Sequence, residues 1–255
     1  MRSDTASRLI WRVAALGCLA GGWEALARRL DSLLLPTFAE TIVALTRLLR
    51  TRELWDALWL SNQAMLIGYA LAALAGVALG LLMGRSRVAE RYLTPYLQIL
   101  MATSKAALIP LVIMAVGLGL WARVWIVFIS AITVIAVNAR IGLRTLDPAW
   151  VEMARSFGAA EGQVWRKVLL RGSLPAVLTG LRLGLTRAIA GMVSVELLLV
   201  ALGIGRLILV YQGSFDAASV YATVLVVVCE ALLLMQAWRC VERRTVWWAG
   251  EGVAR

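Results

Sequence analysis

Residues 61–83 read SNQAMLIGYALAALAGVALGLLM and contain no charged side chain. About 20 apolar residues in an α-helix cross the hydrocarbon core of a bilayer, which is roughly 30 Å thick. The run is rich in Leu and Ala and does not alternate between apolar and polar residues, which favours a helix over a strand. We therefore expect this stretch to span a membrane, and the chain to be an all-α membrane protein.

Small residues recur at every fourth position along this stretch. A face of small residues lets two helix backbones approach closely in lipid. We expect the face to pack against another helix of the same chain, and the alternative is a contact between subunits. The residues are Gly68, Ala72, Gly76, Gly80 and Gly84.

The composition of the whole chain indicates repeated membrane spans. Of its 255 residues, 61% are hydrophobic and only 16% are charged, whereas soluble domains are about half apolar. Hydropathy predicts about six spans. They lie at residues 9–26, 61–83, 93–117, 124–143, 174–199 and 220–238.

The net charge of +11 sets the expected orientation, because cytoplasmic loops are enriched in Arg and Lys. With the N-terminus in the cytoplasm, the outer connections after residues 117 and 200 carry only Arg123 and Arg206. The C-terminus then also lies in the cytoplasm. No soluble segment carries a basic stripe with interleaved aromatic residues, so no nucleic-acid partner is expected.

An amphipathic helix is predicted between the first two spans. Pro36 and Thr37 are typical of a helix start. The apolar side chains of Ile42, Leu45 and Leu49 are expected to share one face of this helix, which would lie on a surface. The chain is thus predicted to comprise an N-terminal span with a periplasmic amphipathic segment (1–60), a core of spans (61–244) and a cytoplasmic tail (245–255).

A polar segment interrupts the apolar chain after the fourth predicted span, and residues 151–175 read VEMARSFGAAEGQVWRKVLLRGSLP. Asp147 and Pro148 are typical of a helix start, and Gly158 offers a break before a second short helix at residues 164–169. Apolar residues next to charges on these helices indicate either docking into a groove of a partner or contact with the bilayer surface.

The residues of this segment resemble the EAA motif of the integral membrane subunits of bacterial ABC importers. The motif is carried by Glu152, Ala154, Gly158 and the later pair Leu174 and Pro175. The stretches NARIGLRTLDPAWVEMARSFGA, LPAVLTGLRLG and VELLLVALGIGRLI resemble the permeases of the sulfonate, taurine, nitrate and bicarbonate group, and the resemblance covers residues 35–244.

The resemblance implies the type I importer fold, with a coupling helix at about residues 148–170 seated in a cleft of an ATPase. It also implies a homodimeric pore in the bacterial inner membrane, two ATPase subunits and a periplasmic solute-binding protein. The solute would be small and anionic, with thiamine-precursor pyrimidines and aromatic acids as alternatives. The residues implied to contact the ATPase are Glu152, Ala154, Arg155, Phe157, Gly158 and Ala159.

The chain carries no recognisable catalytic or nucleotide site. Its only lysines, Lys105 and Lys167, do not follow a glycine, so no P-loop is present, and there is no histidine for a zinc motif. We expect no enzyme activity, metal or cofactor here, with ATP and Mg²⁺ bound by a partner. The rival class, an ATP-independent carrier or channel, would need internal inverted repeats, which the sequence lacks.

Ionisable residues within predicted spans are candidates for the solute path, because charges are costly in lipid. Lys105 could contact an anion or extend to an interface, and Glu196 could pair with an arginine or line the gate. Arg187 is a deeper candidate. Pro175 is expected as a hinge or helix start, while Arg171 stands where the family usually has a proline and predicts a more continuous helix.

Overall fold

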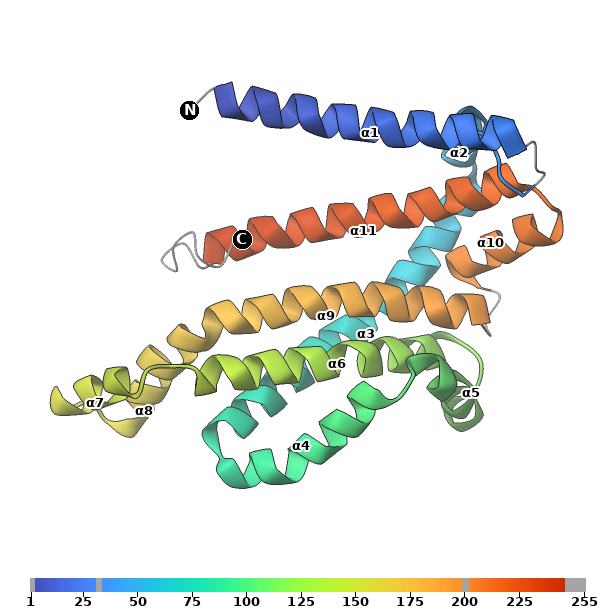
Figure 1. Ribbon diagram of the computed structural model, residues 1–255. Coiled ribbons are helices and arrows are strands. Elements are labelled where there is room, and N and C mark those ends of the chain that lie inside the picture. Colours follow the sequence, from blue (N-terminus) through green and yellow to red (C-terminus); the bar gives the residue numbers. More distant parts are fainter. Residues whose placement is uncertain (1–2, 31–33, 199–201, 246–255) are drawn as a thin grey trace. The chain divides into compact units, whose positions relative to one another are not determined.

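The computed structural model describes residues 3–30, 34–198 and 202–245, and the described secondary structure is helical, as predicted (Figure 1). Contacts divide the chain into two compact units, Met1–Trp59 with Ala201–Cys229, and Leu60–Val200 with Glu230–Arg255. The elements are α1 (Ser3–Leu30), α2 (Phe38–Leu48), α3 (Arg52–Arg85), α4 (Arg87–Ala102), α5 (Lys105–Val116), α6 (Leu120–Arg144), α7 (Pro148–Ser156), α8 (Glu161–Gln163), η1 (Val164–Leu169, a π-helix), α9 (Leu170–Leu198), α10 (Gly203–Gly213) and α11 (Ala217–Thr245).

Four helical stretches in the described chain are long and apolar enough to cross a membrane. They are α3, α6, α11 and the continuous run Glu161–Leu198. These stretches contain the second, fourth and sixth predicted spans, and the fifth as far as residue 198. Residue 199, the predicted end of the fifth span, lies outside the described residues. The first predicted span lies within α1, and its crossing of the membrane stays a prediction.

The third predicted span, residues 93–117, is wrong as a single helix. Helices α4 and α5 meet at an angle of 104°, because Thr103 and Ser104 both have extended backbone. A break leaves carbonyl groups without helical partners, and the Nζ atom of Lys105 donates to the carbonyl oxygens of Leu100 and Thr103. Lys105 thereby stabilises the bend. The pair is either a broken span or a re-entrant segment.

The small-residue face of α3 packs against α6 within the second unit, so the predicted contact within the chain is confirmed. A Cβ atom on Gly80 would lie 2.5 Å from the Ala136 carbonyl oxygen, and one on Gly68 would lie 2.7 Å from that of Val124. Helix α9 approaches α6 in the same way, since a Cβ on Gly142 of α6 would lie 2.5 Å from the Cβ of Ala176. Close backbone approach therefore sets the packing of these three helices.

Helix α2 in the first unit begins where the sequence predicts. Thr37 and Glu40 form a capping box, in which the Glu40 amide donates to Thr37 Oγ1 (3.2 Å) and the Thr37 amide donates to Glu40 Oε2 (2.9 Å). Ile42 and Leu49 are exposed, and the contact of this apolar face with a surface stays a prediction. The buried residues of α2 are Thr41, Ala44 and Leu48, and the last two pack in a hydrophobic cluster of the first unit.

Candidate functional site

The polar segment begins with helix α7, and its predicted start is confirmed. The Asp147 side chain accepts a hydrogen bond from the Ala149 amide (2.9 Å), and Pro148 occupies the first turn. An aspartate at this position stabilises the unpaired amide groups and the positive end of the helix dipole. Asp147 therefore fixes the point at which α7 leaves the preceding turn.

Helix α7 ends in a Schellman motif built around Gly158. The Gly158 amide donates to the Arg155 carbonyl oxygen (2.9 Å), and the Ala159 amide donates to that of Ala154 (3.1 Å). Gly158 has φ +74°, which glycine adopts without steric cost, and a Cβ atom there would meet nothing within 4 Å. Glycine is thus needed at this break for its backbone conformation and not for lack of space.

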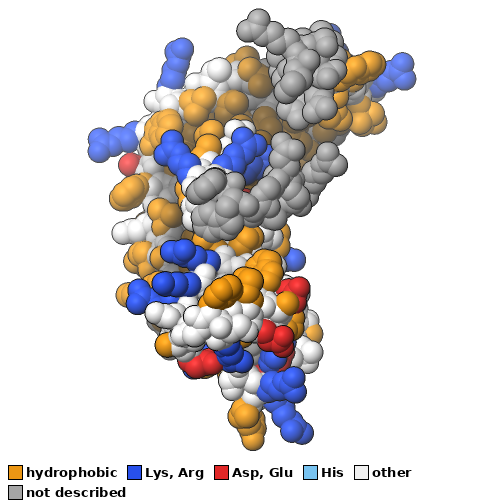
Figure 2. Space-filling view, turned by 90° about the vertical axis from the view of Figure 1, so that its left-hand side faces the viewer, with side chains coloured by type: hydrophobic (Ala, Val, Ile, Leu, Met, Phe, Trp, Pro, Cys, Tyr) orange, Lys and Arg blue, Asp and Glu red, His pale blue; other side chains and the backbone are white. Residues whose placement is uncertain are grey.

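Helix α7 presents an exposed apolar face. Trp150, Met153 and Phe157 are spaced three and four residues apart and are all exposed, with Phe157 reaching 85%. In the described part of the chain, this face packs against no other element strongly enough to bury it. Figure 2 looks onto the end of the molecule that carries α7 and shows apolar side chains beside acidic and basic ones. Such a face is typical of a surface that a partner covers.

The six residues implied to contact an ATPase lie together in α7 and its C-terminal turn. Glu152 and Arg155 are exposed, and the Arg155 guanidinium pairs with Glu161 across the break (2.8 Å). Because both partners are exposed, the pair adds little stability. It links α7 to the helix that follows. The other four residues of the set are Ala154, Phe157, Gly158 and Ala159.

The chain after Gly158 forms one continuous helical run, Glu161–Leu198, through α8, η1 and α9. The predicted separate helix at residues 164–169 is wrong, and Pro175 lies inside α9 and does not begin it. The predicted continuity at Arg171 is found, since this residue keeps the backbone donor that a proline would lack. Within η1 the Leu170 amide donates to the Trp165 carbonyl oxygen, the wider spacing of a π-turn.

A contact that the sequence did not predict joins the end of α3 to η1. The Arg85 guanidinium carbon lies 5.0 Å from the centre of the Trp165 ring, within the range of a cation–π interaction. The two residues are 80 positions apart, so no local sequence pattern could have paired them.

A buried charge cluster lies at the first turns of α6. Arg123 Nη1 is 3.4 Å from Glu196 Oε1 and donates to the Leu60 carbonyl oxygen (3.1 Å), while Ser61 Oγ contacts both Glu196 carboxylate oxygens (2.7 and 2.8 Å). The side chains of Arg123 and Glu196 are only 2% and 1% exposed. The predicted pairing of Glu196 with an arginine is found, but Arg123 lies in a buried helix and not in an outer connection.

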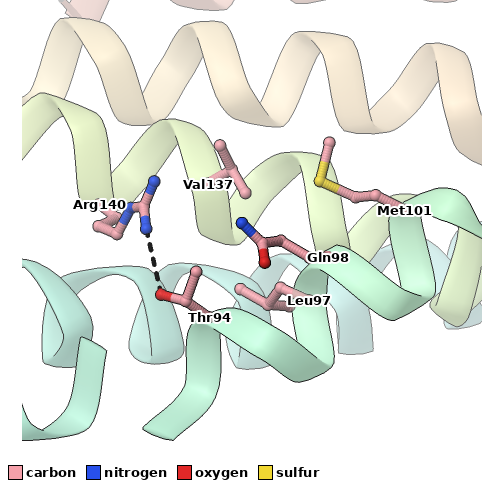
Figure 3. Close-up of a pocket in the computed structure, with 6 residues that line it drawn as sticks. All are labelled: Thr94, Leu97, Gln98, Met101, Val137 and Arg140. Atoms are coloured by element: carbon pink, nitrogen blue, oxygen red, sulfur yellow. Dashed lines mark hydrogen bonds between the residues drawn. The ribbon is translucent and has the colours of Figure 1, made fainter. Parts of the chain in front are cut away.

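A second charge cluster lies at the other end of α6 and involves α4. The Glu90 carboxylate pairs with Arg144 and lies 3.6 Å from Arg140 Nη1. Arg140 also donates to Thr94 Oγ1 (3.3 Å), as Figure 3 shows. Beside this contact is a cavity of about 230 Å³ between α4 and α6. It is lined by Thr94, Leu97, Gln98, Met101, Val137 and Arg140.

The three predicted solute-path residues do not form one site. Glu196 belongs to the buried cluster, whereas Lys105 lies at the bend between α4 and α5. Arg187 is exposed on α9 and is near enough to Lys105 to repel it electrostatically. Glu230 of α11 accepts a hydrogen bond from Asn62 Nδ2. Among the described residues no group of three His, Cys, Asp or Glu side chains could hold a metal ion.

Comparisons with known proteins agree with this arrangement. The family model "Binding-protein-dependent transport system inner membrane component" matches residues 76–247. The taurine transport system permease protein TauC of Escherichia coli (strain K12) is 30% identical over 78% of this chain and 72% of its own length. The nitrate import permease protein NrtB of Leptolyngbya laminosa is 30% identical over 68% of this chain and 62% of its own length.

A solved structure supports the same fold. An inward-facing structure of the MetNI methionine ABC transporter superposes with a TM-score of 0.61 at 21% identity, covering 76% of this chain and 95% of that chain. The chain therefore belongs to the binding-protein-dependent transport system inner membrane components, the multi-pass, non-catalytic permease subunits of ABC importers, which carry no cofactor and use ATP hydrolysed by a partner.

Proposed function

We propose that two copies of this chain form the pore of an ATP-driven importer for a small anionic solute, and that α7 is the helix through which the ATPase acts. The observation that carries this proposal is the exposed apolar face of α7. Helix α7 ends at the turn of Gly158, and the continuous run Glu161–Leu198, long and apolar enough to cross a membrane, begins three residues later. A groove in the ATPase would cover Trp150, Met153 and Phe157. A periplasmic solute-binding protein would deliver the solute.

The contacts around α7 support transmission of movement from the ATPase to the spans. A displacement of α7 reaches the run Glu161–Leu198 through the short turn at Gly158 and the Arg155–Glu161 pair. The same run is held near its far end by Glu196. The contact of Arg85 with Trp165 extends the displacement to α3. Coupling between two sites requires such an element with two arrangements that both sites bias.

The distribution of basic residues supports a cytoplasmic location for α7, and with it cytoplasmic N- and C-termini and six spans that include α1. Exposed basic side chains gather at the end of the second unit that carries α7 (Figure 2), as the positive-inside rule requires of a cytoplasmic surface. They include Arg85, Arg87, Arg91, Arg144, Arg155, Arg166, Lys167 and Arg171.

The anionic solute class is supported by charge within the spans. Lys105 and Arg187 place two positive charges near each other on α5 and α9, where an unpaired cation is costly. Lys105 has three N–H donors and uses two on carbonyl oxygens, so one remains for a solute. Relatives named for taurine, aliphatic sulfonates and nitrate would carry solutes with a negative group.

The coupling role is tested by Gly158→Asp in proteoliposomes that contain the permease, its ATPase and its solute-binding protein. A carboxylate at this turn opposes the negative end of the α7 dipole and meets the ATPase surface. We expect membrane insertion and basal ATP hydrolysis to persist while solute uptake falls at least tenfold. Gly158→Asn is the matched control, because Asn has the same shape, tolerates positive φ and carries no charge. Normal uptake by inserted Gly158→Asp would overturn the coupling role.

The anion path is tested separately by Lys105→Met. We expect the uptake of the anionic solute to fall while ATP hydrolysis stimulated by the solute-binding protein persists. The variant Arg171→Met removes an exposed charge elsewhere in the chain and serves as the control. Transport that Lys105→Met leaves unchanged in both rate and selectivity would remove Lys105 from the solute path.

A further inference from the structure

The cavity between α4 and α6 combines a basic end with an apolar wall. Figure 3 shows the Arg140 guanidinium at one end, the Gln98 amide in the middle, and Leu97, Met101 and Val137 along the remaining sides. Its volume is about 230 Å³. The space fits a charged group with a short length of hydrocarbon, and not a whole folded partner.

The basic end of the cavity keeps a surplus of positive charge. Two arginines, Arg140 and Arg144, share one carboxylate, that of Glu90. The hydrogen bond and ion pair of Arg140 with described residues both use Nη1. A guanidinium has five N–H donors in a planar fork that suits phosphate. Arg140 therefore retains donors for an anion at the mouth of the cavity.

The first turns of α4 indicate where a bilayer surface would meet this cavity. Exposed Arg87 and Arg91 are followed by exposed Tyr92 and Tyr96, and tyrosines are enriched at the level of lipid headgroups. The apolar lining residues Leu97 and Met101 come next along α4. The order along the helix is therefore basic, aromatic and apolar, which matches the order of phosphate, glycerol and hydrocarbon in one leaflet.

We propose that this cavity binds an anionic phospholipid of the cytoplasmic leaflet, with its phosphate at Arg140 and the start of one acyl chain against Leu97, Met101 and Val137. Basic pockets between membrane helices on the cytoplasmic side are suited to anionic headgroups. The site rests on the orientation given under the proposed function. The bound lipid joins α4 to α6 at the end of α6 that lies next to α7 in the chain.

The site is tested by native mass spectrometry of the full chain, assembled with its ATPase, in the presence of equal amounts of phosphatidylglycerol and phosphatidylcholine. The wild type is expected to retain phosphatidylglycerol preferentially. Arg140→Gln should lower this preference about fivefold, the contribution of one basic residue near a charged surface. Arg140→Lys should recover most of it. Gln98→Trp, at an exposed position, should fill the cavity and reduce retention without disturbing the buried core.

Matched controls separate this site from general surface charge and from the solute path. Arg171→Gln removes an exposed charge outside the cavity and should leave the lipid preference unchanged. An added alkanesulfonate should not displace phosphatidylglycerol. Displacement that depends on Arg140 would identify a solute site, and equal retention of the two lipids by the wild type would also overturn the proposal. Solute uptake is measured in parallel. Normal uptake by a transporter that shows no lipid preference would contradict the lipid site and leave the proposed transport function standing.

Discussion

The two charge clusters of α6 lie at opposite ends of one helix and differ in their access to solvent. At the first turns, Arg123 and Glu196 are buried almost completely. At the last turns, Glu90, Arg140 and Arg144 leave about a quarter to a third of each side chain exposed. Removing one partner of a buried pair leaves an uncompensated charge, at a cost of about 3–5 kcal/mol, whereas exposed pairs contribute about 0–1 kcal/mol.

This difference indicates which end of the α6 bundle is fixed and which can rearrange. The buried cluster ties α6 to α9 and to α3 through Glu196, Ser61 and the Leu60 carbonyl. The exposed cluster ties α6 only to α4, and it lies next to the segment that leads into α7. The end of α6 that carries the buried cluster is therefore held more firmly than the end that carries the partly exposed cluster.

The largest effect is expected from Glu196→Gln, which breaks the buried cluster. Arg123 would keep its charge without a carboxylate, and the free energy of unfolding should fall by about 3–5 kcal/mol. Thermal unfolding followed by tryptophan fluorescence measures the change. Replacing both partners, as Arg123→Met with Glu196→Leu, should restore much of the loss, because a paired hydrophobic replacement leaves no buried charge. Equal destabilisation by the single and double variants would contradict this account.

A smaller effect is expected from Gly80→Ala, which tests the contact of α3 with α6 between the two clusters. The new Cβ atom would lie 2.5 Å from a backbone carbonyl oxygen, so the helices must separate at a cost of about 1–3 kcal/mol. Gly162→Ala in α8 is the control, because its Cβ would meet nothing within 4 Å. Thermal unfolding should rank Gly80→Ala as the more destabilising, and the reverse order would contradict close backbone packing.

Arg85→Gln should change stability by about 0.5–1 kcal/mol, the value of an exposed cation–π contact. Its effect on transport is expected to exceed its effect on unfolding, because Trp165 lies in η1, within the run Glu161–Leu198 and close to its α7 end. Uptake per ATP hydrolysed is the measurement. Arg87→Gln, two residues later and also exposed, is the matched control. A ratio unchanged by Arg85→Gln would exclude this contact from transmission.

The smallest effect on stability is expected from Glu90→Gln, the counterpart of Glu196→Gln at the exposed end. The unfolding free energy should change by less than about 1 kcal/mol, and the change should shrink further in high salt. The salt dependence of thermal unfolding checks this. A loss as large as that of Glu196→Gln would remove the contrast between the two ends.

Much of the fold follows from local sequence, and the errors have more than one cause. Residues 61–83 and 124–143 are long, apolar and uninterrupted, so their helices were predictable from hydropathy. Asp147 and Gly158 act on their own backbone neighbours, which makes the start and end of α7 predictable as well. The burial of Arg123 could not be predicted, because it depends on a partner 73 residues away.

The other errors have both local and long-range causes. The bend at Thr103 is stabilised by the Lys105 side chain reaching back to carbonyl groups, which hydropathy averages over. Helix η1 continues into α9 because Arg171 keeps its backbone donor. Pro175 therefore lies inside α9 and does not begin a new helix. The cavity beside Arg140 is lined by residues of both α4 and α6. Its prediction would need the relative position of the two helices, which the sequence of neither helix specifies.

The uninterrupted run Glu161–Leu198 has a mechanical consequence. Its 38 residues make a rod about 57 Å long at 1.5 Å per residue. Glu196 holds this run close to its C-terminal end, so the run can act as a lever with its pivot there. A tilt of only about 5° would carry the opposite tip through about 5 Å, roughly the pitch of one helical turn. Small rotations at the anchored end thus correspond to large displacements at the end that follows α7 in the chain.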